Sequence, residues 1–172
     1  MLPVSGLSRY RSRKIVPFNK AKKLISGFKS KKRKVGLCHG GFDVLHAGHI
    51  RHFESSKKLC DVLFVSITSD RFVAERKGGS RPVFTDRIRA YAVSAVEFVD
   101  YVIIADFSTA IEVIKSLKPD YYIKGPDYIN RKSAGIERER AAIKSVGGRI
   151  IYTRDPKLST TGIIGYLKRQ DG

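Results

Sequence analysis

The sequence has few cysteines and no long apolar run, and these shortages exclude two classes of protein. Cys38 and Cys60 are its only cysteines, too few for the disulfide framework of a small secreted domain. No run of about 18 apolar residues is present, which argues against a transmembrane helix. The start of the chain also lacks the basic, apolar and cleavage-site pattern of a secretory signal. We therefore expect a protein of the reducing cytoplasm without a membrane span.

Acidic residues are absent before Asp43, although the whole chain carries 16 of them against 34 lysines and arginines, a net charge of +18. Twelve basic residues lie in positions 1–42, so only +6 remains for the rest. A basic arm of this kind binds RNA, anionic lipid or another anionic partner through counterion release and surface potential. A solvated helix face explains the same charge, and a transit peptide is a third reading. The sequence leaves these readings open.

The length of 172 residues, 42% of them hydrophobic and 29% charged, suits one soluble domain with a single sizeable core. No internal repeat or low-complexity segment is present. Apolar residues recur with helical spacing over 18–28, which predicts an amphipathic helix docked on the body, with Asn19 as its N-cap. We divide the chain into a basic N-terminal arm, 1–34, and a domain over 35–168.

Strand and helix patterns alternate along that domain. Short apolar or β-branched runs predict strands over 35–38, 61–67, 101–104, 121–123 and 149–152. Helical periodicity and capping residues predict helices over 47–59, 86–98, 109–117, 136–146 and 161–168. This order predicts an α/β fold with a doubly wound, mainly parallel open sheet, which binds ligands beyond the carboxyl ends of its strands at the switch point.

All four histidines lie between positions 39 and 52. His46 falls in the loop after the first strand, and His49 falls at the start of the next helix, with Gly48 between them. Phosphates bind at such helix N-termini, and two imidazoles there are able to stabilise charge on a phosphorus centre during transfer. A zinc site is a weaker reading, because paired cysteine spacing is missing; we assign no metal-ligating residues.

Five segments resemble the cytidylyltransferase-like branch of the nucleotidyltransferases that carry a His-x-x-His signature. They are the opening signature at 40–49, a Lys-Gly and Arg-Pro-Val loop at 77–83, a following arginine at Arg87, a Lys-Gly-x-Asp-Tyr element at 124–128 and a Ser-Thr-Thr segment at 159–164. Together they cover roughly residues 35–168 in the family's order. The resemblance implies a Rossmann-like nucleotidyltransferase fold.

The resemblance also implies a reaction and a set of site residues. An acceptor phosphate attacks the α-phosphorus of a nucleoside triphosphate, usually with Mg²⁺, and releases pyrophosphate. The implied catalytic residues are His46, His49 and Lys124. The implied nucleotide-binding residues are Gly40, Gly41, Phe42, His46, His49, Gly125, Asp127, Ser159, Thr160 and Thr161. The implied phosphate or acceptor contacts are Lys77, Arg81 and Arg87. Asp43 is expected to hold the loop, and relatives that are often dimers imply a homodimer.

Within the family the sequence is similar to the adenylyltransferase domain of the ADP-heptose synthesis enzyme and to the glycerol-3-phosphate cytidylyltransferases. The Lys-Gly-x-Asp-Tyr and Ser-Thr-Thr segments favour the first, which adenylates a sugar 1-phosphate with ATP. His39, Pro126 and Lys157 depart from the family pattern, so CTP with glycerol 3-phosphate or another alcohol phosphate remains an alternative. A catalytically inactive module that binds polyanions through its arm is an alternative of another class. Any sugar kinase step is expected from another chain.

Overall fold

The fold is built on a five-stranded sheet in which every pair of neighbouring strands is parallel. The computed structural model describes residues 6–78, 81–130, 133–156, 162 and 165–166. The strands are β1 (Val35–Gly40), β2 (Val62–Thr68), β3 (Tyr101–Ala105), β4 (Tyr121–Lys124) and β5 (Arg149–Tyr152). Their order in the sheet is β3-β2-β1-β4-β5, which confirms the doubly wound parallel sheet expected from the alternating pattern.

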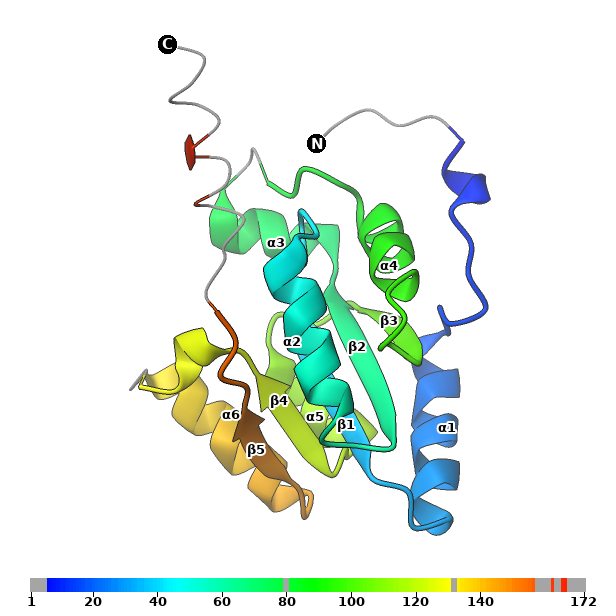
Figure 1. The fold of residues 1–172 in the computed structure, drawn as a ribbon, viewed down its shortest axis with the longest axis vertical. Helices are drawn as coiled ribbons and strands as arrows, with labels where there is room; N and C mark the ends of the chain where they lie inside the picture. Colours follow the sequence, from blue (N-terminus) through cyan, green and yellow to red (C-terminus); the bar gives the residue numbers. More distant parts are fainter. Residues whose placement is uncertain (1–5, 79–80, 131–132, 157–161, 163–164, 167–172) are drawn as a thin grey trace.

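Helices cover both faces of the sheet (Figure 1). The α-helices are α1 (Phe18–Ser30), α2 (Ala47–Lys57), α3 (Asp70–Lys77), α4 (Asp86–Ser94), α5 (Ala110–Leu117) and α6 (Ala134–Ser145). Two 3-10 helices, η1 (Leu7–Arg9) and η2 (Pro126–Tyr128), complete the described elements. None of the described helices is long and apolar enough to cross a membrane.

Two hydrophobic clusters lie on opposite faces of the sheet because side chains alternate along each strand. In β2, Phe64 belongs to the cluster under α1, α5 and α6, whereas Leu63 and Val65 belong to the cluster under α2 and α4. Every residue of β2 is buried, as expected for a strand covered on both faces. The two clusters fix the helices against the sheet and thereby fix the loops at its carboxyl edge.

The chain changes direction across the sheet between β1 and β4. From β1 it proceeds to β2 and β3 on one side, and from β3 it returns to β4 on the other side. The loops that leave β1 and β4 therefore diverge to opposite faces and open a crevice between them. This is the switch point at which the sequence analysis expects a ligand.

Residues ahead of β1 pack onto the domain. Ala21 and Ile25 of α1 are fully buried in the cluster that also holds residues of β1, α5 and α6. Ile15 forms a parallel bridge with Val102 of the edge strand β3, and the N–H of Val16 donates to the Val102 carbonyl at 2.9 Å. The basic segment thus contributes a helix to the same core.

The structure corrects several local predictions. Helix α1 begins at Phe18 after Pro17, so Asn19 is not its N-cap. The predicted 86–98 helix ends at Ser94. Helix α3 was not predicted, because no apolar stripe marks it; among its residues whose burial the structure describes, only Val73 is fully buried. The predicted helix over 161–168 falls largely outside the described residues.

Candidate functional site

A cavity of about 590 Å³ opens at the switch point. The carboxyl ends of β1 and β4 form its floor, and the amino ends of α2 and α6 with the segment after β5 form its walls. Its lining includes His39, Gly40, Phe42, His46, His49, Lys124, Asp127, Glu139 and Asp155. The site therefore draws on the segments that follow three strands, a typical source of ligand-binding residues in this type of sheet.

The loop from β1 to α2 is tightly built. Phe42 has a positive φ of 45°, an uncommon conformation for a bulky residue that the surrounding structure must hold in place. A Cβ at Gly40 would lie 3.1 Å from the Phe42 ring, so the glycine makes room for it. Asp43 is buried and accepts from the N–H groups of Val83 at 2.7 Å and Phe84 at 3.2 Å. Asp43 thus ties the loop to the segment before α4.

His46 and His49 lie side by side at the amino end of α2. Their rings are stacked with centroids 3.8 Å apart, and His46 is the N-cap residue with extended backbone. Both ring nitrogens of His46 are buried and have no hydrogen-bond partner among the described residues. Burial lowers the pKa of His46 below 6.5, which favours a neutral ring at neutral pH. The ring nitrogens and the first N–H groups of the helix together form a site for an anionic ligand.

His39 and His52 have different surroundings. His39 contacts the Ser66 hydroxyl through Nδ1 at 3.1 Å and the Thr68 hydroxyl through Nε2 at 3.3 Å. His52 contacts Thr153 Oγ1 at 2.9 Å and Cys38 Sγ at 3.4 Å. Burial lowers the pKa of His39 to about 3 and that of His52 to about 4. These two rings cross-link elements around the cavity, and both stay neutral at neutral pH.

Lys124 brings a buried cation to the opposite wall. Its side chain is 8% exposed, and its Nζ lies 2.6 Å from Glu139 Oε2 on α6. The ammonium also lies 3.9 Å from the centroid of the Tyr128 ring, a favourable cation–π position. The carboxylate and the ring compensate the ammonium for lost water, so a charged lysine is held at the cavity.

The cytidylyltransferase-like family model matches residues 37–165. The chain belongs to the cytidylyltransferase-like family of nucleotidyltransferases. It is 44% identical over 134 residues to the bifunctional protein HldE of Campylobacter fetus, and 33% identical over 156 residues to HldE of Helicobacter pylori strain J99. These alignments cover 77% and 91% of this chain but 27% and 32% of the relatives, so the chain spans about a quarter to a third of their length.

Two solved structures superpose on this chain. The lipopolysaccharide core biosynthesis protein of Thermoplasma volcanium superposes with a TM-score of 0.58 at 28% identity, covering 74% of this chain and 99% of that one. A pantoate-beta-alanine ligase of Francisella tularensis superposes with a TM-score of 0.57 at 16% identity, covering 94% of this chain and 79% of that one. The second likeness is one of fold alone.

Most of the residues implied by the family signature meet in the cavity. The cavity lining includes Gly40, Gly41, Phe42, His46, His49, Lys124, Gly125 and Asp127. They come from two segments that are far apart in the sequence and that β1 and β4, as neighbouring strands, bring together. The parallel sheet thus assembles the nucleotidyltransferase signature into one site.

The remaining implied residues lie elsewhere or outside the described part. Arg81 was expected at a phosphate or acceptor, but its Nη1 lies 3.0 Å from Asp43 Oδ2 in a largely buried ion pair. Arg87 was expected there too, but it lines a second hollow of about 530 Å³ between α4 and residues 10–15. Ser159, Thr160 and Thr161 lie outside the described residues, as does the side chain of Lys77.

Three charged residues of the cavity were missed from the sequence: Arg76, Glu139 and Asp155. Arg76 lies on the unpredicted helix α3, and Glu139 lies on the polar side of a helix whose apolar side alone was informative. Arg89 was missed as well, although it is 1% exposed. It donates to the carbonyls of Gly41 and Phe84 and pairs with Asp70. An arginine in an amphipathic helix gives no sequence signal for such burial.

The cavity also fits the Mg²⁺ that the family implies. Mg²⁺ usually keeps several waters and is held by substrate phosphates with one or two carboxylates. Asp127 and Glu139 line the cavity, and the described residues include no group of three or more metal-ligating side chains. These residues suit an ion that arrives on a triphosphate, where it would neutralise phosphate charge.

Proposed function

We propose that this chain transfers a nucleoside monophosphate from a nucleoside triphosphate to a phosphorylated acceptor. An oxygen of the acceptor phosphate forms a bond to the α-phosphorus, and the bond from that phosphorus to the bridging oxygen breaks. Pyrophosphate leaves with the electron pair. The attacking phosphate oxygen is already anionic, so the step needs positioning and charge stabilisation more than a general base.

The pair of stacked histidines at the start of α2 carries this proposal. A neutral imidazole has one N–H donor, and both ring nitrogens of His46 are buried without a partner among the described residues. A buried nitrogen without a hydrogen-bond partner lowers the free energy of unfolding unless a ligand supplies that partner. Phosphate oxygens at the amino end of α2 would satisfy His46 and lie at the positive end of the helix dipole, while Lys124 adds a positive charge from the end of β4.

For the substrates we propose ATP and a sugar 1-phosphate of the heptose type. The Lys-Gly-x-Asp-Tyr and Ser-Thr-Thr segments support this choice through their similarity to the adenylyltransferase of ADP-heptose synthesis. A structural neighbour named for lipopolysaccharide core biosynthesis agrees with a sugar acceptor. CTP with glycerol 3-phosphate or another alcohol phosphate is the competing pair.

The test is a pyrophosphate-release assay with Mg²⁺, in which ATP and CTP are each paired with sugar 1-phosphates, glycerol 3-phosphate and related alcohol phosphates. We expect turnover with ATP and one sugar 1-phosphate. His46→Ala should lower kcat by about 100- to 1000-fold, the usual cost of losing one donor to a developing negative charge. Ile50→Ala is the matched control, because Ile50 is 41% exposed on the same helix.

Three outcomes would contradict the proposal. Turnover with CTP and an alcohol phosphate alone would replace the adenylyl reaction by the cytidylyl one. Nucleotide binding without turnover for any pair would favour the inactive polyanion-binding module. Undiminished turnover of His46→Ala would remove the histidine from the reaction.

A further inference from the structure

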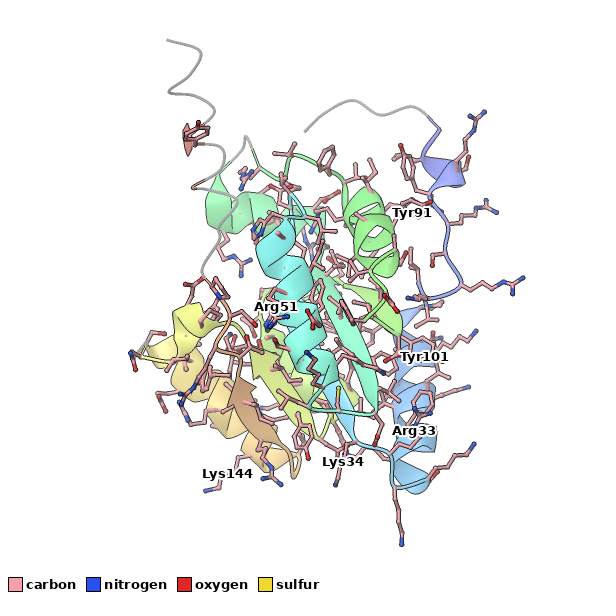
Figure 2. All side chains as sticks on the ribbon, in the orientation of Figure 1. Arg33, Lys34, Arg51, Tyr91, Tyr101 and Lys144 are labelled. Carbon is pink, nitrogen blue, oxygen red and sulfur yellow. The ribbon has the colours of Figure 1, made fainter. Side chains whose placement is uncertain are left out.

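The segment after β5 presents a carboxylate to the cavity from a wall that the family signature does not describe. The N–H of Thr153 donates to the Lys124 carbonyl at 2.9 Å, which continues the alignment of the chain beside β4. Asp155 then lies against α2, where the Ser55 hydroxyl donates to its Oδ1 at 2.7 Å and Arg51 Nε lies 3.7 Å from the same oxygen. Figure 2 labels Arg51 on α2, above the strands β4 and β5.

The second oxygen of the Asp155 carboxylate, Oδ2, differs from Oδ1 in its hydrogen bonding. The Asp155 side chain is 7% exposed, and its Oδ2 is buried with no hydrogen-bond partner among the described residues. The His52 ring is not the donor, because its two nitrogens contact Thr153 and Cys38. Buried carboxylate oxygens are nearly always paired, and an unpaired one is costly. Asp155 also lines the cavity, so a ligand in the cavity is able to supply the missing donor.

The position of Asp155 along α2 indicates which part of a ligand it meets. Phosphates at the amino end of α2 would lie against His46 and His49, and Ser55 is six residues beyond His49. That separation corresponds to about 9 Å along a helix. The cavity is continuous from His46 to Asp155. A nucleoside triphosphate with its phosphates at the histidines is long enough to bring its nucleoside to Asp155.

We propose that Asp155 Oδ2 accepts a hydrogen bond from the nucleoside of the bound triphosphate, and that this contact makes the site selective for the nucleotide. This inference rests on the proposed function. Two groups of ATP or CTP have the required chemistry: a ribose hydroxyl and the exocyclic amine of the base. A carboxylate accepts from either, and it rejects an analogue that lacks the donor because its own buried charge is then left unpaired.

The experiment compares nucleotide analogues on the wild type and on Asp155→Asn. If ATP is the substrate, it is compared with inosine triphosphate, which lacks the 6-amine, and with 2′-deoxy-ATP and 3′-deoxy-ATP, which each lack one hydroxyl. If CTP is the substrate, it is compared with UTP and with the corresponding deoxy-CTPs. We expect wild-type kcat/KM to be about 10- to 100-fold lower for one analogue, the range for a hydrogen bond to a charged group. In Asp155→Asn, kcat/KM for the natural nucleotide divided by kcat/KM for that analogue should fall to about one. The group that this analogue lacks is then the hydrogen-bond donor.

Ser55→Ala is the matched control, since it removes the hydroxyl that holds Oδ1 and keeps the carboxylate. It should retain most of the discrimination between analogues. Thermal denaturation checks that both variants fold. An Asp155→Asn variant that loses activity equally with ATP and every analogue, or that only raises the Mg²⁺ requirement, would overturn the proposal.

The same ratios can be measured as dissociation constants by calorimetry, which separates the two proposals. If the wild type binds ATP without turnover, the proposed reaction fails while the analogue ratios still test Asp155. If the wild type binds neither ATP nor CTP, both proposals are wrong.

Discussion

At the scale of single residues, the four histidines divide into two pairs with different consequences. His39 and His52 are each hydrogen-bonded through both ring nitrogens and have pKa values lowered to about 3 and about 4. His46 has buried nitrogens without a described partner. His39 and His52 therefore contribute to the stability of the fold, whereas His46 and His49 form part of the ligand site.

This division predicts how stability depends on pH. An unfolded histidine takes up a proton near pH 6.5, whereas His39 and His52 stay neutral in the folded state until about pH 3 and pH 4. The unfolded state therefore binds more protons between about pH 6.5 and pH 4, and the free energy of unfolding falls as the pH is lowered through that window. The slope for each histidine is at most about 1.4 kcal/mol per pH unit.

Urea unfolding at pH 7 and pH 5 measures this effect. The loss of stability between the two pH values should be smaller for His52→Asn than for the wild type, because asparagine does not titrate. Equal losses in the two proteins would show that His52 is protonated in the folded state as readily as in the unfolded one.

Sequence reasoning located His46 and His49, because they flank Gly48 at a readable strand-to-helix junction. Lys124 was implied by the family resemblance of the Lys-Gly-x-Asp-Tyr element. Sequence reasoning could not locate Glu139 or Asp155. Each is a carboxylate that polar helix or loop positions commonly carry, and only the pairing of β4 with β1 and β5 brings them to the cavity. The resemblance implied a phosphate or acceptor contact for Arg81, and its ion pair with Asp43 was not readable because the two residues are distant along the chain.

At the scale of secondary-structure elements, the strands were predictable and one helix was not. The strands are short apolar or β-branched runs, and β2 is buried along its whole length. The glycines after α6 close that helix as expected: Gly147 has a φ of +79° and the N–H of Gly148 donates to the Ile143 carbonyl. Helix α3 packs few apolar side chains. It is instead fixed by charge, through the pairing of Asp70 with Arg89 of α4 at 2.7 Å.

Arg89 therefore joins three elements, and Arg89→Lys should loosen all of them. A lysine retains the charge but has no planar fork, so it cannot serve Asp70 and the carbonyls of Gly41 and Phe84 together. Each buried carbonyl left without a donor costs about 1–3 kcal/mol. We expect a loss of that size in urea unfolding, together with reduced turnover, because Gly41 belongs to the loop that lines the cavity.

Arg71→Lys is the control for this change. Arg71 is an exposed arginine on α3 whose ion pair with Asp106 is open to solvent, so its replacement should alter the free energy of unfolding by less than about 0.5 kcal/mol. A wild-type stability for Arg89→Lys would mean that α3 and the loop are held by their own packing.

At the scale of the whole molecule, the basic N-terminal segment serves the fold on one side and faces solvent on the other. Ala21 and Ile25 are buried against the sheet, and Phe28 packs on Phe64 and Tyr101. Lys20, Lys22 and Lys23 are exposed on the outer side of the same helix. Figure 2 labels Arg33 beside this helix and Lys34 on the segment that leads to β1. The charge pattern revealed the outer side, and the apolar spacing revealed the inner one.

These two sides can be separated by mutation. The triple variant Lys20→Glu, Lys22→Glu and Lys23→Glu leaves the buried side intact, so its thermal midpoint and its turnover should stay close to those of the wild type. Its binding to heparin or RNA should weaken, with a shallower dependence on salt, because each lost phosphate contact lowers the slope of log K against log salt by about 0.7 to 0.9.

Deletion of residues 1–34 is the contrasting change, and it is expected to unfold the domain. The deletion uncovers the cluster that includes Val35, Leu37 and Ile103, and Ile25→Ala alone should cost about 2–5 kcal/mol, a large part of the stability of a single domain. Loss of polyanion binding by the deletion therefore says nothing about the lysines. A deletion variant that stays folded and active would show that α1 is dispensable to the core, and a triple variant that loses turnover would place the basic face in the reaction.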